Sequence, residues 1–139
     1  MQSLKVMLDE GAYLPERAHE DDAGYDLRAM EDATIQPRSH HVFDTGVHMM
    51  IPSGYAGFIK SKSGLNVKHN LLSDGLVDAS YTGSIRVKLY NHGDSQYIVH
   101  RGDKISQIAI LPVSTPDIEV VDHLEDTPRG ENGFGSTGR

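Results

Sequence analysis

Short segments in which apolar and polar residues alternate constrain the fold of this chain more than any other feature. In residues 84–90, the side chains of Ile85, Val87 and Leu89 fall on one face and charged or polar side chains on the other. This two-residue period is typical of a half-buried β-strand. Turn sequences rich in Gly, Pro, Asn and Asp separate it from similar segments at residues 42–50, 55–60, 96–100 and 104–113.

No long segment carries apolar residues at helical spacing, so the pattern favours an all-β fold: an antiparallel sandwich, a jelly roll or a closed barrel. The best helix candidate is short and runs from Gly64 to about Asn70. Ser63 is expected to cap it, because a serine oxygen can accept an unpaired backbone N–H of the first turn. We therefore predict a β fold with one short helix.

Composition limits the function classes. The 139 residues suit one domain with a sizeable core, and the absence of cysteine excludes disulfides, thiolate metal sites and cysteine nucleophiles. The first residues do not resemble a signal peptide and no apolar stretch is long enough to span a bilayer, so we expect a cytoplasmic protein without a membrane partner. A net charge of −7 disfavours a nucleic-acid partner, although local basic residues or a bridging cation can still hold a small polyanion.

The composition changes after Pro128. Residues 129–139 contain four glycines and a single bulky apolar side chain, Phe134, so we expect a core domain over residues 1–128 and a flexible arm over 129–139. Residues 133–138 fit the Gly-x-Gly-x-x-Gly dinucleotide fingerprint, but no helix can follow them, and we reject that interpretation. The arm still offers Arg129 and two hydroxyls as phosphate donors; a frayed terminus without function is the alternative.

Two other clusters carry chemistry. Residues 60–65 place two lysines and a hydroxyl at the start of the expected helix, which can bind phosphate, although taken alone this cluster is better explained as a solvated turn with ordinary surface lysines. In residues 75–83, Asp78 is a candidate base and Tyr81 a candidate sugar contact, unless Asp78 only closes a turn. Asp26 and Gln107 interrupt strand-like segments and are either site residues or ordinary outward positions.

The eight histidines do not form a known metal-binding pattern. His40 and His41 are adjacent and point to opposite faces of a strand, and the sequence holds neither His-Glu-x-x-His nor His-x-His. A Gly-x-Ser-x-Gly nucleophile elbow is also missing. The absence of these patterns excludes the common zinc and serine hydrolase classes.

Five segments in order resemble the five motifs of the trimeric dUTP diphosphatases, or dUTPases. They are AGYDL (23–27), KSGL (62–65), GLVDASYTG (75–83), RGDKISQI (101–108) and RGENGFGSTG (129–138). The resemblance implies a jelly-roll-like or distorted β-barrel fold and a homotrimer with active sites at subunit interfaces. It also implies Mg²⁺-dependent hydrolysis of dUTP to dUMP and pyrophosphate, which limits uracil incorporation into DNA and supplies dUMP for dTTP synthesis.

The same resemblance implies residue roles. The catalytic residues would be Asp78, which activates water, together with Ser63, Gln107 and Arg129. Asp26 would support Mg²⁺ indirectly through water, the metal being held mainly by the triphosphate. Substrate binding would involve Lys62, Ser63, Gly64, Gly75, Leu76, Val77, Asp78, Tyr81, Gln107, Arg129, Phe134, Gly135, Ser136 and Thr137, with Phe134 stacked over uracil.

This chain departs from the family pattern at three places. The second motif has Lys62 where arginine is usual, Ser80 replaces an acidic residue, and the loop over residues 66–74 is short. Two alternatives are a dCTP deaminase of the same fold and a nucleotide-responsive regulatory module. Lys88 stands where the deaminase resemblance places a catalytic glutamate, and a lysine cannot replace that carboxylate.

Overall fold

The computed structural model of the chain describes residues 3–135, over which short strands follow one another and a single short helix interrupts them. The elements are β1 (Lys5–Leu8), β2 (Gly24–Arg28), β3 (Ala33–Ile35), β4 (Ser39–Asp44), β5 (Val47–Met50), β6 (Tyr55–Lys60), α1 (Ser63–His69), β7 (Leu71–Leu72), β8 (Asp74–Val77), β9 (Arg86–Asn91), β10 (Tyr97–Val99) and β11 (Lys104–Pro112).

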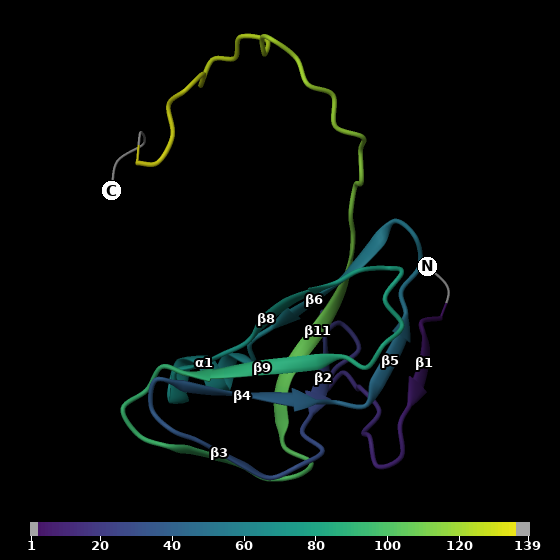
Figure 1. Ribbon diagram of the computed structural model, residues 1–139, viewed down its shortest axis with the longest axis vertical. Coiled ribbons are helices and arrows are strands. Elements are labelled where there is room, and N and C mark those ends of the chain that lie inside the picture. Colours follow the sequence, from purple (N-terminus) through teal and green to yellow (C-terminus); the bar gives the residue numbers. More distant parts are fainter. Residues whose placement is uncertain (1–2, 136–139) are drawn as a thin grey trace.

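All strand pairings in this part of the chain are antiparallel. A four-stranded sheet has the order β2-β11-β6-β8, and a three-stranded sheet has the order β4-β9-β7. Two small ribbons, β1-β5 and β3-β10, complete the body, which Figure 1 shows as a set of crossing strands with α1 at one end. The all-β, jelly-roll-like prediction is confirmed.

The hydrophobic core contains side chains from both of the larger sheets. The alternation predicted for residues 84–90 is confirmed, because Ile85, Val87 and Leu89 are at most 2% exposed. Their partners come from both sheets, and burial of each such side chain contributes about 1.5–3 kcal/mol. The core also includes Leu27, Phe43, Ile59, Leu71, Ile105 and Ile108.

The segment 42–50 was expected as one strand and forms two. β4 ends at Asp44 and β5 begins at Val47, with Gly46 between them at φ +67°. That left-handed conformation suits glycine, and the Asp44 carboxylate accepts a hydrogen bond from the Gly46 N–H at 3.0 Å. The prediction of a continuous strand was wrong because a local side-chain bond stabilises a break that the alternation does not reveal.

Helix α1 matches its predicted range within one residue at each end, but the expected cap is wrong. Lys62 occupies the N-cap position, no side chain caps the helix, and Ser63 is the first helical residue. Starting one residue early moves Ser63 into the first turn. The helix ends at His69, and the C-cap residue Asn70 adopts a left-handed conformation and donates its N–H to the Asn66 carbonyl.

β11 leads into an exposed C-terminal segment. The Val113 N–H donates to the Gly54 carbonyl at 2.9 Å, and residues 114–135 then leave the body without forming a helix or strand (Figure 1). The domain boundary expected at residue 128 stays a prediction. Among the described residues, no helix has the length and apolar character needed to cross a membrane.

Candidate active site

Asp26 lies at the centre of a cluster with two lysines. This carboxylate is only 5% exposed and pairs through Oδ1 with Lys62 Nζ and through Oδ2 with Lys104 Nζ, the latter at 3.2 Å. Two ammonium groups thus face one buried carboxylate, and Lys62 also interacts with the Asp22 carboxylate. The two lysines bring positive charge to this place in an acidic protein, which the binding of a small polyanion requires.

Gln107 stands beside Asp26 on the same sheet. The two residues are register partners on β11 and β2, and Gln107 Nε2 donates to the Ser61 carbonyl at 2.9 Å. A Cβ added at Gly24 would approach Gln107 Oε1 to 2.1 Å. The glycine of the first motif thus makes the space in which the Gln107 amide lies.

Ser63 and Gly64 form the start of α1, directly after Lys62. Ser63 and Gly64 are exposed, and a Cβ added at Gly64 would meet nothing within 4 Å. The predicted Asp26, Lys62, Ser63, Gly64 and Gln107 therefore gather where β2, β6 and β11 meet the helix. We call this group the Asp26–Gln107 half-site.

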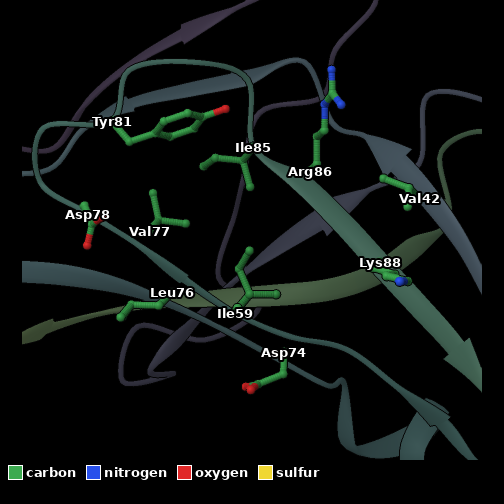
Figure 2. A pocket seen from close by; sticks show the side chains of 11 residues that line it. Val42, Ile59, Asp74, Leu76, Val77, Asp78, Tyr81, Ile85, Arg86 and Lys88 are labelled. Carbon is green, nitrogen blue, oxygen red and sulfur yellow. The ribbon is translucent and has the colours of Figure 1, made fainter.

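A second part of the site is a cavity of about 450 Å³ beside β8. Figure 2 shows Asp78 and Tyr81 on one side of it, Ile59 at its floor, and Arg86 and Lys88 on the strand opposite. Its full lining consists of Val42, Ile59, Asp74, Gly75, Leu76, Val77, Asp78, Tyr81, Ile85, Arg86 and Lys88. The structure thus gathers all five residues predicted from the third motif into one cavity, the Asp78–Tyr81 half-site.

β8 is an edge strand of its sheet. It pairs with β6 in the four-stranded sheet, from Gly57 opposite Val77 to Lys60 opposite Asp74, and ends the strand order. The outward backbone N–H and C=O groups of an edge strand can bind a flat partner. Gly75 lets the strand lie close to Ile59, whose Cδ1 would be 3.3 Å from an added Cβ.

The loop of residues 78–85 carries Asp78 and Tyr81. Asp78 is exposed, and its backbone carbonyl accepts the Tyr81 N–H at 3.0 Å, so the turn does not depend on its carboxylate. The Tyr81 hydroxyl donates to the Ser84 carbonyl at 2.7 Å. An added Cβ at Gly83 would lie 2.6 Å from that hydroxyl, so glycine allows the ring to lie across the loop.

Two basic residues of the cavity were missed as site residues. Arg86 and Lys88 fall on the polar face of β9, which the alternation alone describes as a solvent face. In the fold this face borders the cavity, and Lys88 Nζ lies 5.1 Å from the Tyr90 ring centroid. The alternation was the available signal, but the position of β8 beside β9 is a tertiary feature.

The two half-sites lie apart within one chain. Gln107, Lys60 and Asp74 form one row across β11, β6 and β8, whereas Asp78 follows Val77, which is opposite Gly57. Asp78 lies four positions after Asp74, a distance of about 13 Å along the strand direction at 3.3 Å per residue. A carboxylate at Asp78 cannot reach a group held by Gln107 in the same chain.

The described part of the C-terminal segment, residues 114–135, leads away from the body and from both half-sites (Figure 1). Arg129 Nε donates to the Asn132 carbonyl at 2.5 Å within its own segment, and the Phe134 side chain is fully exposed. Gly135 adopts a left-handed φ of +100°. Ser136 and Thr137 lie outside the described residues, so their predicted roles are carried forward as predictions.

Residues 3–135 contain no group of three or more His, Cys, Asp or Glu side chains that could hold a metal ion. The Asp26 carboxylate faces two lysines, which suits an outer role better than direct ligation. Mg²⁺ commonly binds through substrate phosphates with one or two carboxylates nearby. The residues present fit a metal that arrives on a polyphosphate.

Sequence comparison identifies relatives over the whole chain. A family profile described as dUTPase matches residues 10–138. The deoxyuridine 5'-triphosphate nucleotidohydrolase of Gloeothece citriformis is 45% identical over 139 residues, covering 97% of this chain and 96% of the relative. The mouse protein of the same name is 41% identical over 135 residues, which cover 96% of this chain and 83% of the mouse protein.

Structure comparison gives the same family. A mutant dUTPase of Staphylococcus bacteriophage 80alpha with dUpNHpp has a TM-score of 0.94 at 31% identity, over 100% of both chains. A mutant dUTPase of phage phi11 of S. aureus, described with a structural Mg(II) ion, has a TM-score of 0.84 at 30% identity. This second match covers 90% of the present chain and 100% of the phage phi11 chain.

Proposed function

Because the chain belongs to the dUTPase family, we propose that it hydrolyses dUTP to dUMP and pyrophosphate, and thereby limits uracil incorporation into DNA and supplies dUMP for dTTP synthesis. One observation carries this proposal most directly: an edge strand with a glycine borders a cavity and ends at an exposed carboxylate, Asp78. A base, a sugar and a phosphate can occupy such an arrangement in that order.

Uracil is read by the backbone of β8. The edge groups of Gly75 to Asp78 offer alternating donors and acceptors, which match the fixed donor and acceptor edge of uracil. Gly75 allows close approach, and Leu76 and Val77 line the cavity. The confined space beside the strand disfavours the extra methyl group of thymine.

Tyr81 selects deoxyribose. Its ring is 45% exposed and borders the cavity, while its hydroxyl is held by the Ser84 carbonyl. A ring fixed in this way can pack against the face of a sugar and leave no space for a 2′-hydroxyl. A site of this shape rejects ribonucleotides by crowding.

Asp78 is the general base. It removes a proton from water as the water oxygen attacks the α-phosphorus and the bond from that phosphorus to the bridging oxygen breaks. Pyrophosphate leaves with the electron pair of this bond, and the proton stays on the Asp78 carboxylate until solvent takes it. General base catalysis of this kind contributes about 10²–10⁴ in rate.

The Asp26–Gln107 half-site binds the phosphates. Lys62 provides the charge that arginine usually supplies at this place, but as a point charge without a planar fork. The Ser63 hydroxyl and the Gln107 amide orient the α-phosphoryl group and the attacking water. Asp26 places the Lys62 and Lys104 ammonium groups and faces the hydrated metal.

Mg²⁺ is the cofactor and is carried by the triphosphate of the substrate. When bound, it neutralises phosphate charge and stabilises the leaving pyrophosphate. The chain contributes the lysine ammonium groups, the Ser63 hydroxyl and the Asp26 carboxylate around this charge. None of these groups needs to ligate the metal directly.

The active unit is a homotrimer whose sites join half-sites of different subunits. The trimer is a property of the family, and the separation of Asp78 from Gln107 along the sheet supports a shared site. The exposed segment after Val113 supports an arm that reaches a site and closes over it. Arg129, Gly135, Ser136 and Thr137 bind phosphate there, and Phe134 stacks on uracil.

The test is a product assay with Mg²⁺ and each of dUTP, dCTP, dTTP and UTP. We expect dUMP and pyrophosphate from dUTP and turnover at least about 100-fold lower with the other three. Ammonia released from dCTP would indicate the deaminase chemistry instead. That outcome would contradict the proposal. It is not expected, because the deaminase resemblance requires a carboxylate at the position of Lys88.

A further inference from the structure

His48 connects the loop of residues 78–85 to the N-terminal strand. It lies on β5, opposite Met7 of β1, and its side chain is 18% exposed. Its Nδ1 is 2.7 Å from the Thr82 carbonyl oxygen, and its Nε2 is 3.0 Å from Asp9 Oδ1. One imidazole ring therefore joins this loop to the carboxylate that follows β1.

Both partners of His48 are acceptors. A carbonyl and a carboxylate cannot donate, and a neutral imidazole carries only one N–H. Both hydrogen bonds exist together only when the ring is an imidazolium. Loss of the proton leaves a lone pair facing either Thr82 or Asp9 and opens the connection at one end.

We propose that His48 is a positioning residue for nucleotide binding: its imidazolium holds the loop of residues 78–85 in the shape that presents Tyr81 to the sugar. This inference rests on the function proposed above, because it assigns the loop to the substrate. Deprotonation loosens the Thr82 anchor, so affinity for dUTP falls while the chemical step is little affected. The site becomes pH-sensitive through a residue that does not touch the substrate.

The groups around His48 favour the imidazolium form of its ring. The hydrogen bond to the Thr82 carbonyl, followed by the hydrogen bond to Asp9, raises the pKa of His48 above its ordinary value. Asp44, at the end of β4, is a second negative charge near the ring. Two positive charges lie nearby: Lys5 of β1 lines a pocket together with His48, and Arg86 stands near Asp44. The nearest charges to His48 are thus acidic.

A second anchor of the loop has a different pH range. The Ser84 hydroxyl donates to Asp44, and this bond, then the Gly46 N–H, lowers the pKa of Asp44. That carboxylate stays charged at all pH values above its ordinary 3.8, so the Ser84 anchor persists where His48 titrates. A raised pKa at His48 gives an anchor that is complete below about pH 6.5 and is lost as pH rises through the folded-state value.

The experiment measures kcat and KM for dUTP from about pH 6 to about pH 9 in the wild type, His48→Leu and His48→Gln. We expect the wild-type KM to rise about fivefold as pH exceeds the His48 pKa, which corresponds to the loss of one hydrogen bond. The kcat should change by less than about twofold. His48→Leu should show the high KM throughout. His48→Gln should keep the low KM at every pH, because its amide carries two N–H groups that do not titrate.

Titration of the substrate and of other groups is common to all variants and cancels in the comparison with His48→Leu. His100→Gln is the matched control, since His100 is an exposed turn residue outside this network. Its KM profile should equal that of the wild type. A His48→Leu protein with the wild-type KM and pH profile would overturn the proposal.

A measurement without nucleotide separates this inference from the proposed function. Side-chain NMR of the intact protein should show His48 titrating above about 6.5, and the protection of the amides of residues 78–85, taken relative to the intrinsic exchange rate at each pH, should fall as its proton is lost. A lower titration point overturns the anchor whatever the activity. If the wild type fails to hydrolyse dUTP, the proposed function fails, and these nucleotide-free readouts still decide the role of His48.

Discussion

The side chain of Gln107 occupies the space where Gly24 has no Cβ. An added Cβ would come within 2.1 Å of Gln107 Oε1 and 2.8 Å of its Cδ. Gly24 and Gln107 belong to motifs more than 80 positions apart, and β2 and β11 bring them together as sheet neighbours. The glycine of the first motif is therefore a requirement for the glutamine of the fourth.

Gly24→Ala should displace the Gln107 amide from the Ser61 carbonyl and reduce kcat for dUTP by about tenfold, the equivalent of one lost polar contact of 1.4 kcal/mol. The thermal unfolding midpoint should fall only modestly, since the amide end is flexible. Steady-state kinetics and a melting curve measure the two effects.

The control is the double variant Gly24→Ala with Gln107→Ala. If the two residues act through this contact, the double variant should be no less active than Gln107→Ala alone. Additive losses would show that Gly24 is needed for another reason.

Asp78→Asn should retain folding and nucleotide affinity but lower kcat by at least about 10²-fold, because an amide cannot accept the proton of the attacking water. Asp94→Asn is the matched control outside the cavity. Asp94 is exposed and pairs with Arg38 at 3.4 Å, a surface ion pair that contributes little. Substantial turnover by Asp78→Asn in a single-turnover assay would remove Asp78 from the role of base.

Lys62→Met should destabilise the protein by about 2 kcal/mol and raise KM for dUTP, because it removes a charged partner from the buried Asp26. Lys60→Met, which breaks the exposed pair with Asp74, should cost at most about 1 kcal/mol. Urea unfolding curves of both variants give the comparison. Equal losses would indicate that the Asp26 cluster has no special electrostatic role.

Truncation after Pro128 should leave the unfolding transition unchanged, because Arg129 bonds within its own segment and Phe134 is fully exposed. Hydrolysis of dUTP should fall by at least about 10²-fold, the loss expected when groups that orient the phosphates and exclude water are removed. Phe134→Ala should account for part of that loss through KM. A truncated protein with full kcat/KM would show that the arm does not close over the site.

Local sequence was sufficient for strands with clear alternation, such as β6 and β9, and for the position of α1. It did not reveal the β1-β5 ribbon, whose pairing depends on chain segments about 40 residues apart. It also missed the break at Gly46 and the capping position of Lys62, because single side-chain and backbone bonds decide such boundaries.

The site was predicted in the same uneven way. The third-motif residues line one cavity, since they are contiguous along β8 and its loop, and their roles toward a substrate stay predictions. The alternation placed Arg86 and Lys88 on a polar strand face but could not show that this face borders a cavity. The position of His48 depends in the same way on which loop packs against it. Propensity describes the residues of a strand, whereas register and sheet order decide what those residues face.

Mixed trimers test the shared site most directly. Asp78→Asn and the double variant Ser63→Ala with Gln107→Ala should each be nearly inactive alone. When equal amounts are unfolded together and reassembled, a site that joins two subunits is intact in about one case in four, because each of two neighbours must carry the right half. We predict recovery of about a quarter of wild-type kcat; a mixture that reassembles into trimers and stays as inactive as its components would contradict a site shared between chains.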